Sequence, residues 1–219
     1  MLGARPKIKA EAASVGLTAE RLKASLDALC AIEPAFAAAR ARIGDPEPRI
    51  REPGYETMLR AIVGQQVSTK AAAAILARVE AATGGVGDPA RVAATSDTDL
   101  RAAGLSGQKV AYVKSLAEEV LSGRLDFANL PDDDEEAIEA MVRVKGIGRW
   151  SAEVYLLFAE GRGDVWPAGD LAVRQEIGRI LGMDEHPSER MVREMAEAWR
   201  PHRGAAAIFA WHHRHIVAL

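Results

Sequence analysis

A short glycine turn between two helical segments constrains the fold of this chain more than any other feature. The turn, Lys145-Gly146-Ile147-Gly148, follows a helical stretch from about Glu135 to Val142 and opens onto another helix at Arg149. Two glycines around one apolar residue let the backbone turn sharply, and the first amides of the next helix stay free to face an anion. The pattern therefore predicts a phosphate-binding turn between two helices, over residues 135–160.

A single carboxylate, Asp170, stands at the far end of the segment that follows the turn. Apolar residues at helical spacing predict an amphipathic helix from Trp150 to about Glu160. At about 1.5 Å per residue this helix carries the chain roughly 16 Å away, so the glycine-rich loop 161–163 must bring it back. The sequence from Pro167 to Asp170 is typical of a turn into a helix, which places Asp170 at an N-cap. Capping alone would be enough to explain this aspartate.

The composition favours helices over sheets. Alanine, leucine, arginine and glutamate dominate the 219 residues, and aromatic residues make up only 5%. This length suffices for one large domain or two small lobes. We therefore expect an all-α fold, in which the whole chain, 1–219, is one unit.

Charge and cysteine content exclude several classes of protein. The net charge is −3, so nucleic-acid binding would have to rest on locally placed cations. The single cysteine, Cys30, excludes a disulfide framework within the chain and a four-cysteine cluster or zinc ribbon. Residues 1–10 lack a continuous apolar core, and no run of eighteen apolar residues occurs. We expect no contact with a membrane and a cytoplasmic, nucleoid-associated protein.

The amino-terminal half shows a series of helices separated by turns. A helical pattern from Thr18 to about Ile43 is divided by Pro34, and the Gly/Pro-rich residues 44–48 form a boundary between lobes. The helices between Tyr55 and Ala81 are interrupted by Gly-Gln-Gln-Val-Ser at 64–68, where a serine or threonine can cap the second helix. The adjacent glutamines Gln65 and Gln66 would ordinarily be solvated polar residues at a corner.

The turn, the connecting helix and Asp170 together resemble the helix-hairpin-helix and Gly/Pro/Asp motif of the HhH-GPD superfamily of DNA glycosylases. The resemblance covers residues 50–215 and implies that Asp170 is the catalytic residue. It also implies that Lys145, Gly146, Gly148 and Arg149 grip DNA phosphates without reading the bases. In this superfamily backbone carbonyls of the turn also hold a monovalent cation, Na+ or K+; the matching positions lie near Val142, Val144 and Gly146. No other cofactor is implied.

Two further motifs extend the resemblance towards DNA. The segment 64–68 resembles the loop whose tip enters duplex DNA and fills the space left by an extruded nucleotide, so Gln65 or Gln66 would be the plug. Gly-Leu-Ser-x-x-Lys at 104–109 resembles a turn whose basic residue, Lys109, lies towards DNA. A solvated surface lysine is the alternative for Lys109.

Trp150 separates the branches of the superfamily. Glycosylases that also cut the backbone typically carry at this position a lysine that attacks the sugar, and an indole cannot do amine chemistry. A tryptophan here resembles the 3-methyladenine DNA glycosylase II (AlkA-like) group, in which it stacks on the flipped base; a core tryptophan is the alternative. Trp211 matches a second pocket aromatic. Val154 and Leu171 fall where relatives often carry tyrosines, which predicts a wider pocket.

The resemblance therefore implies a monofunctional DNA glycosylase of base excision repair. It would hydrolyse the N-glycosidic bond of alkylated purines such as 3-methyladenine and 7-methylguanine in double-stranded DNA, without AP lyase activity. The implied fold is two-lobed, with a central lobe at 53–144, a second lobe from 1–50 plus 160–219, and the helix-hairpin-helix unit and Asp170 lining the cleft between them. A non-catalytic helix-hairpin-helix DNA-binding module and a glycosylase for mismatched or oxidised bases are the alternatives.

We expect a monomer without a side-chain metal site. The acidic run at 132–136 is expected to begin a helix, where carboxylates complement the helix dipole. The histidines His212, His213 and His215 have no accompanying ligand spacing, so we expect surface or interface roles for them.

Overall fold

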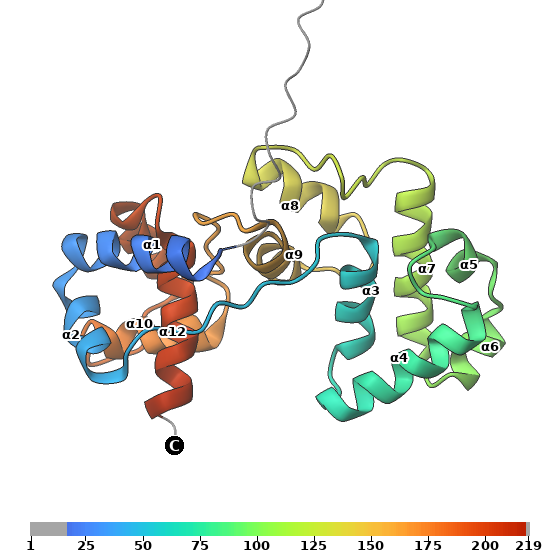
Figure 1. The fold of residues 1–219 in the computed structure, drawn as a ribbon, viewed down its shortest axis with the longest axis horizontal. Helices are drawn as coiled ribbons and strands as arrows, with labels where there is room; N and C mark the ends of the chain where they lie inside the picture. The colour runs from blue at the N-terminus through green and yellow to red at the C-terminus, as the bar shows by residue number, and fades with distance from the viewer. Residues whose placement is uncertain (1–16, 218–219) are drawn as a thin grey trace, which may run out of the picture.

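The computed structural model describes residues 17–217, which form helices and connecting loops without a β-strand (Figure 1). In chain order the elements are α1 (Ala19–Ile32), α2 (Pro34–Ile43), α3 (Tyr55–Gly64), α4 (Thr69–Thr83), α5 (Pro89–Ala94), α6 (Asp97–Ala102), α7 (Gly107–Leu121), α8 (Asp134–Val142), α9 (Arg149–Tyr155), the π-helical turn η1 (Leu156–Glu160), α10 (Leu171–Ile180), α11 (Glu189–Ala196), the 3-10 turn η2 (Glu197–Trp199) and α12 (Arg203–Val217). The predicted all-α class is confirmed. None of the helices in this part of the chain has the length and hydropathy to cross a membrane. Residues 1–10, which lack a continuous apolar core, lie outside the described range.

Capping side chains set most helix boundaries. A hydroxyl or carboxylate oxygen accepts a hydrogen bond from a first-turn amide at Thr18, Ser68, Asp88, Ser96, Ser106, Asp133, Asp170 and Ser188. Each such bond satisfies an amide that has no partner within its helix. The acidic run thus begins α8, as predicted, and Pro34 starts α2 directly after α1. These boundaries are local, which is why the sequence alone predicts them.

The buried apolar side chains form two separate clusters. The first is built by α3 to α9 and includes Met58 and Leu116; the second is built by α1, α2 and α10 to α12 and includes Phe36 and Phe209. Figure 1 shows α3 to α7 on one side of α8 and α9, and α1, α2, α10 and α12 on the other. The chain passes between the two groups through the linker 44–54 and again through the segment that follows α9.

The helix after the glycine turn changes geometry halfway along. α9 ends at Tyr155 and continues as the π-helical turn η1, so the predicted continuous amphipathic helix to Glu160 is wrong in its second half. All side chains from 155 to 159 are buried: Tyr155, Leu156 and Ala159 in the first cluster, Leu157 and Phe158 in the second. A helix enclosed on all sides has no polar face, and periodicity cannot detect the wider turn.

The loop that leads to α10 is fastened to the start of α12. Asp164 accepts hydrogen bonds from Arg200 at 2.7 Å and from Arg203 at 2.9 Å. The amide of Gly204 donates to the carbonyl of Gly163 at 2.8 Å, and a Cβ at Gly204 would lie 2.6 Å from that carbonyl oxygen. Only a glycine allows this close approach. These contacts, made with residues far along the chain, hold the loop that leads to Asp170, the N-cap of α10.

Candidate active site

Asp170 and Trp150 meet where α10 begins beside α9. One carboxylate oxygen of Asp170, Oδ1, accepts from the amide of Val173 at 2.9 Å, which is the predicted N-cap bond. The other, Oδ2, accepts from the indole Nε1 of Trp150 at 2.7 Å. Asp170 can therefore cap α10 and also take the predicted catalytic role, because the two roles use different oxygens. Two donors from separate elements hold this half-buried carboxylate in one orientation.

Trp150 faces an aromatic cavity and does not belong to the core. Its side chain is 49% exposed, so the core alternative is wrong. It lines a cavity of about 500 Å³ together with Val154, Phe158 and Trp211; we call this the aromatic cavity. The rings of Phe158 and Trp211 lie 5.6 Å apart, tilted by 32°. The second predicted pocket aromatic, Trp211, is thus close to Trp150, while Leu171 is 58% exposed beside Asp170.

Basic residues surround the aromatic cavity, and sequence reasoning missed them. Arg49 and Arg51 from the linker and Arg214 and His215 from α12 line it as well. The amide of Arg51 donates to the carbonyl of Phe158 at 2.9 Å, and its guanidinium carbon lies 6.0 Å from the centroid of that ring. The only available signal was the arginine content of a linker, which does not indicate where the linker runs.

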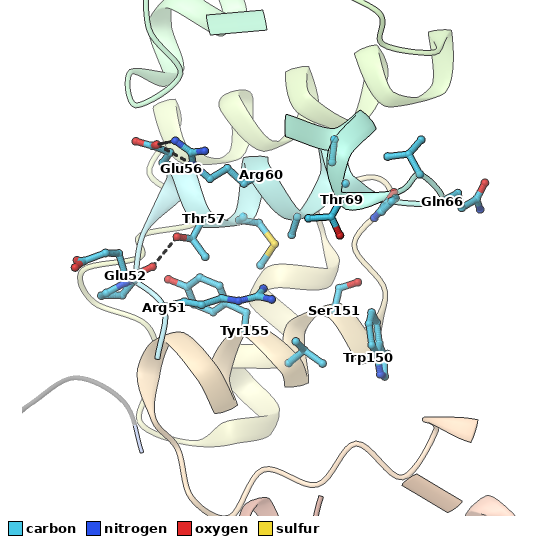
Figure 2. Close-up of a pocket in the computed structure, with 18 residues that line it drawn as sticks. Arg51, Glu52, Glu56, Thr57, Arg60, Gln66, Thr69, Trp150, Ser151 and Tyr155 are labelled. Carbon is cyan, nitrogen blue, oxygen red and sulfur yellow. Dashed lines mark hydrogen bonds and ion pairs between the residues drawn. The ribbon is translucent and has the colours of Figure 1, made fainter. Parts of the chain in front are cut away.

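A larger cavity of about 1260 Å³ adjoins the aromatic cavity (Figure 2). It lies between α3 and α9, and Arg51, Trp150 and Val154 line both cavities. Figure 2 shows the side chain of Arg51 extending from the linker into this space, with Trp150 and Gln66 towards its other end. The two cavities are therefore neighbours that share part of their walls.

The glycine turn is closely packed. The amide of Lys145 donates to Ser115 Oγ at 3.0 Å, and Gly146 has a φ of +82°. A Cβ at Gly146 would lie 2.1 Å from the ring of Tyr112. Both the positive φ and this close contact therefore require glycine at this position. Gly148 is the N-cap of α9 and offers no side chain to its first amides. The amides of Ser151 and Ala152 donate to the carbonyl of Gly148, which leaves those of Arg149 and Trp150 for an acceptor such as a phosphate oxygen.

Of the two predicted charge contacts of the turn, Lys145 is exposed and Arg149 is engaged within the chain. Arg149 Nη1 donates to Glu135 at 2.7 Å, and its Nε donates to Glu153 at 2.8 Å. Burial raises the pKa of Glu153 to about 7, although Arg149 opposes this shift. Arg149 therefore braces α8 against α9, and a phosphate would compete with two carboxylates for it.

The structure separates the two candidate plug residues. Gln65 Nε2 donates to the carbonyl of Gly146 at 3.0 Å, which attaches the loop to the glycine turn. Gln66 is exposed at the tip and adopts a φ of +56°, unusual for a residue other than glycine. Of the two, Gln66 alone is placed to project outwards.

Lys109 is half-buried and is bonded within the chain. Its Nζ donates to the carbonyl of Val63 at 2.7 Å, at the carboxyl end of α3, and burial lowers its pKa. A fully solvated lysine is therefore wrong for this residue, while its position towards DNA stays a prediction. A helix end leaves carbonyls without partners, and a lysine from a neighbouring helix satisfies one of them here.

The histidines near the carboxyl end do not share one environment. His213 is buried, and its Nδ1 lies 2.8 Å from the buried carboxylate of Glu176, so a surface role is wrong for this residue. His212 Nε2 lies 3.2 Å from the carbonyl of Ile43, and His215 lines the aromatic cavity. Within residues 17–217 no three His, Cys, Asp or Glu side chains are grouped to hold a metal ion.

Comparison with known proteins places this geometry in a family context. Residues 59–201 match the family described as HhH-GPD superfamily base excision DNA repair protein. The chain is 34% identical over 165 residues to DNA-3-methyladenine glycosylase 1 of Schizosaccharomyces pombe, covering 74% of this chain and 72% of the relative. In two further curated relatives the match covers 58% and 63% of their length.

Two solved structures share the fold. One is a DNA-3-methyladenine glycosidase from Bacillus halodurans, with a TM-score of 0.79, 31% identity, and coverage of 85% of this chain and 87% of that chain. The other is the S. pombe 3-methyladenine DNA glycosylase in complex with abasic DNA, with a TM-score of 0.73, 29% identity, and coverage of 90% and 97%.

Proposed function

Because the chain belongs to the HhH-GPD superfamily of base excision DNA repair proteins, we propose that it is a DNA glycosylase that releases alkylated purines from double-stranded DNA. The observation that carries this proposal is the hydrogen bond from Trp150 to Asp170 at the edge of the aromatic cavity. It joins a carboxylate, which can stabilise a sugar cation, to a ring on which a base can stack. The 3-methyladenine glycosylases similar to this chain support the substrate class.

The chemistry requires little beyond these groups. Alkylation at N3 or N7 gives a purine a positive charge, so it leaves readily and an oxocarbenium-like sugar develops as the bond breaks. Asp170 would stabilise that cation and orient the attacking water; one preorganised group of this kind is typically worth a hundred- to thousandfold in rate. Stacking on Trp150 and Trp211 would favour electron-poor purines through a cation-π contribution.

Access to the base requires the nucleotide to leave the helix, which costs a few kcal/mol and less for a weakened pair. The glycine turn would hold the phosphates through the first amides of α9 and through Lys145, without reading sequence. Gln66 would fill the space left in the stack, while Gln65 positions the loop through its bond to Gly146. Duplex DNA containing alkylated bases is the proposed partner, and the protein would act as a monomer in the cytoplasm, associated with the nucleoid.

We further propose that the enzyme has no lyase activity and needs no cofactor for cleavage. Lyase chemistry requires an amine to form a Schiff base with the sugar, and Trp150 occupies the position of that amine. The carbonyls of Val142, Val144 and Gly146 would hold a monovalent cation. Those of Val144 and Gly146 each accept one bond, from Ile147 and Gln65, and a carbonyl has two lone pairs. Such a cation would add positive charge beside the bound phosphates.

Chromatography of bases released from methylated duplex DNA tests the proposal. The wild-type protein should free methylpurines, and strand breaks should appear only after alkali. Breaks before alkali would contradict the absence of lyase activity. Binding of duplex DNA without release of any base would favour a non-catalytic DNA-binding module, with Asp170 acting as a helix cap alone.

A further inference from the structure

We propose that Arg51 is a specificity-determining residue, which shifts the selectivity of this site towards neutral lesion bases at the expense of bases that carry a fixed positive charge. This inference rests on the proposed glycosylase function and concerns the choice among its substrates. This effect of Arg51 opposes the preference of the tryptophan rings, which favour cationic purines.

The position of Arg51 makes it part of the wall of the site. It lines both the aromatic cavity and the larger cavity, as do Trp150 and Val154. The bond from its amide to the carbonyl of Phe158 fixes the backbone at 2.9 Å, and the guanidinium lies over the Phe158 ring, which packs against Trp211. A base stacked in the aromatic cavity would therefore lie close to this positive charge.

The charge of Arg51 is not neutralised by the chain. In the part of the chain that the structure describes, no carboxylate or carbonyl accepts a hydrogen bond from its guanidinium, whose one contact of note is the face of Phe158. Arg60, which lines the same larger cavity, is by contrast paired with Glu56, and Arg149 is paired with two glutamates. Because no carboxylate within residues 17–217 is paired with it, the charge of Arg51 is offset only by solvent and can act on a bound ligand.

Bond cleavage makes the base more negative by one unit of charge, whichever substrate is bound. The C1′–N9 bond breaks with its electron pair going to N9, and water forms the new bond to C1′ and gives up a proton. A 7-methylguanine cation leaves as a neutral base, and the proton passes to solvent. Hypoxanthine leaves as an anion and takes up that proton.

A nearby cation therefore affects the two substrates differently on the way from free DNA to the transition state. It repels the cationic base when that base enters, and the repulsion fades as the bond breaks. The cation attracts the neutral base more strongly as the bond breaks, because negative charge develops on that base. For half a unit charge on the base at about 6 Å and an effective dielectric constant of about 20, the interaction energy with Arg51 corresponds to a change of roughly tenfold in kcat/KM.

The test compares two duplexes of one sequence that contain a single hypoxanthine or a single 7-methylguanine. In Arg51→Gln, kcat/KM for hypoxanthine should fall about tenfold, while kcat/KM for 7-methylguanine should stay constant or rise. Arg51→Lys keeps the charge and should keep the wild-type ratio. Arg42→Gln removes the same charge from an exposed position on α2 outside both cavities, and it should not alter the ratio. Melting temperatures confirm that each variant is folded.

The outcomes separate this inference from the proposed function. An unchanged ratio in Arg51→Gln, or equal losses on both substrates, would overturn the specificity role although the enzyme remains a glycosylase. Release of 7-methylguanine without any hypoxanthine by the wild-type protein would overturn it as well. Release of neither base, nor of any other alkylated purine, would refute the glycosylase function itself.

Discussion

The indole nitrogen of Trp150 lies 2.7 Å from Oδ2 of Asp170, although twenty residues separate them in the chain. The same carboxylate caps α10 through Oδ1. One short contact thus connects the helix that follows the glycine turn to the group proposed to stabilise the sugar cation. Because both oxygens are held, substitutions can separate the capping role from the chemical one.

Asp170→Asn should abolish most base release while the protein stays folded. Asparagine is as good an N-cap as aspartate but carries no charge, so the rate of base release should fall about a hundred- to thousandfold. Single-turnover release of methylpurines and a thermal melt measure the two effects. Asp133→Asn, at the corresponding N-cap of α8, is the matched control and should retain the wild-type rate. Equal activity in Asp170→Asn would contradict the assignment.

Trp150→Phe should slow the chemical step while lesion binding is largely kept. The phenyl ring preserves a stacking surface, but the hydrogen bond to Asp170 is lost, and a bond to a charged group contributes enough for roughly a tenfold change. Trp211→Phe keeps a ring in the same cavity without touching that bond. Single-turnover rates at saturating enzyme should therefore drop in the first variant much more than in the second, and the reverse order would be inconsistent with a positioning role.

Gln65 and Gln66 should behave differently when they are truncated. Gln66→Gly should weaken binding to a lesion duplex and leave the free energy of unfolding nearly unchanged, because glycine accommodates a φ of +56°. Gln65→Ala should lower the free energy of unfolding by about 1 kcal/mol, since the carbonyl of Gly146 loses its donor. Denaturant unfolding and fluorescence anisotropy give the two quantities. A plug role for Gln65 would be indicated if only Gln65→Ala weakened binding.

Gly146→Ala should destabilise the protein strongly, and Gly148→Ala should not. The first variant combines a left-handed backbone with a Cβ 2.1 Å from the Tyr112 ring, so we expect a loss of about 2 to 4 kcal/mol in the free energy of unfolding. A Cβ at Gly148 meets no atom within 4 Å in the free protein. Similar melting temperatures for the two variants would show that the hairpin is less tightly packed than described.

The stability of the protein should fall relative to Glu153→Gln as the pH rises from about 4.5 to about 7. Burial raises the pKa of Glu153 to about 7 from its ordinary value of 4.5, so the folded state retains a proton that the unfolded state has lost. Its charged neighbours are Arg149, Arg193 and Glu135. The free energy of unfolding that the proton contributes is complete below pH 4.5 and is lost as the pH passes 7. Urea unfolding of both proteins across this range measures the difference, and a constant difference would contradict the raised pKa.

The fold is predictable from sequence wherever its cause is local. Capping side chains such as Ser68 and Asp170, the division at Pro34 and the glycine turn act over a few residues, so residue type and spacing suffice to place these helix boundaries. The prediction failed after Tyr155, where packing on two clusters replaces the amphipathic pattern. Nor did the sequence indicate that Lys109 bonds to Val63, which lies 46 residues away.

The candidate site, like the fold, was predictable from the sequence only in part. Residue type and short spacing were enough to specify the all-helical class and the glycine turn, and the resemblance to the glycosylase superfamily supplied the candidates Asp170 and Trp150. The packing of the linker, α9 and α10 was needed to establish three further relationships. Trp150 donates to Asp170, Gln65 holds the turn while Gln66 projects, and Arg51 joins the pocket wall. Packing brings together side chains whose separation along the chain says nothing about their distance in space, so no local pattern in the sequence could have indicated these contacts.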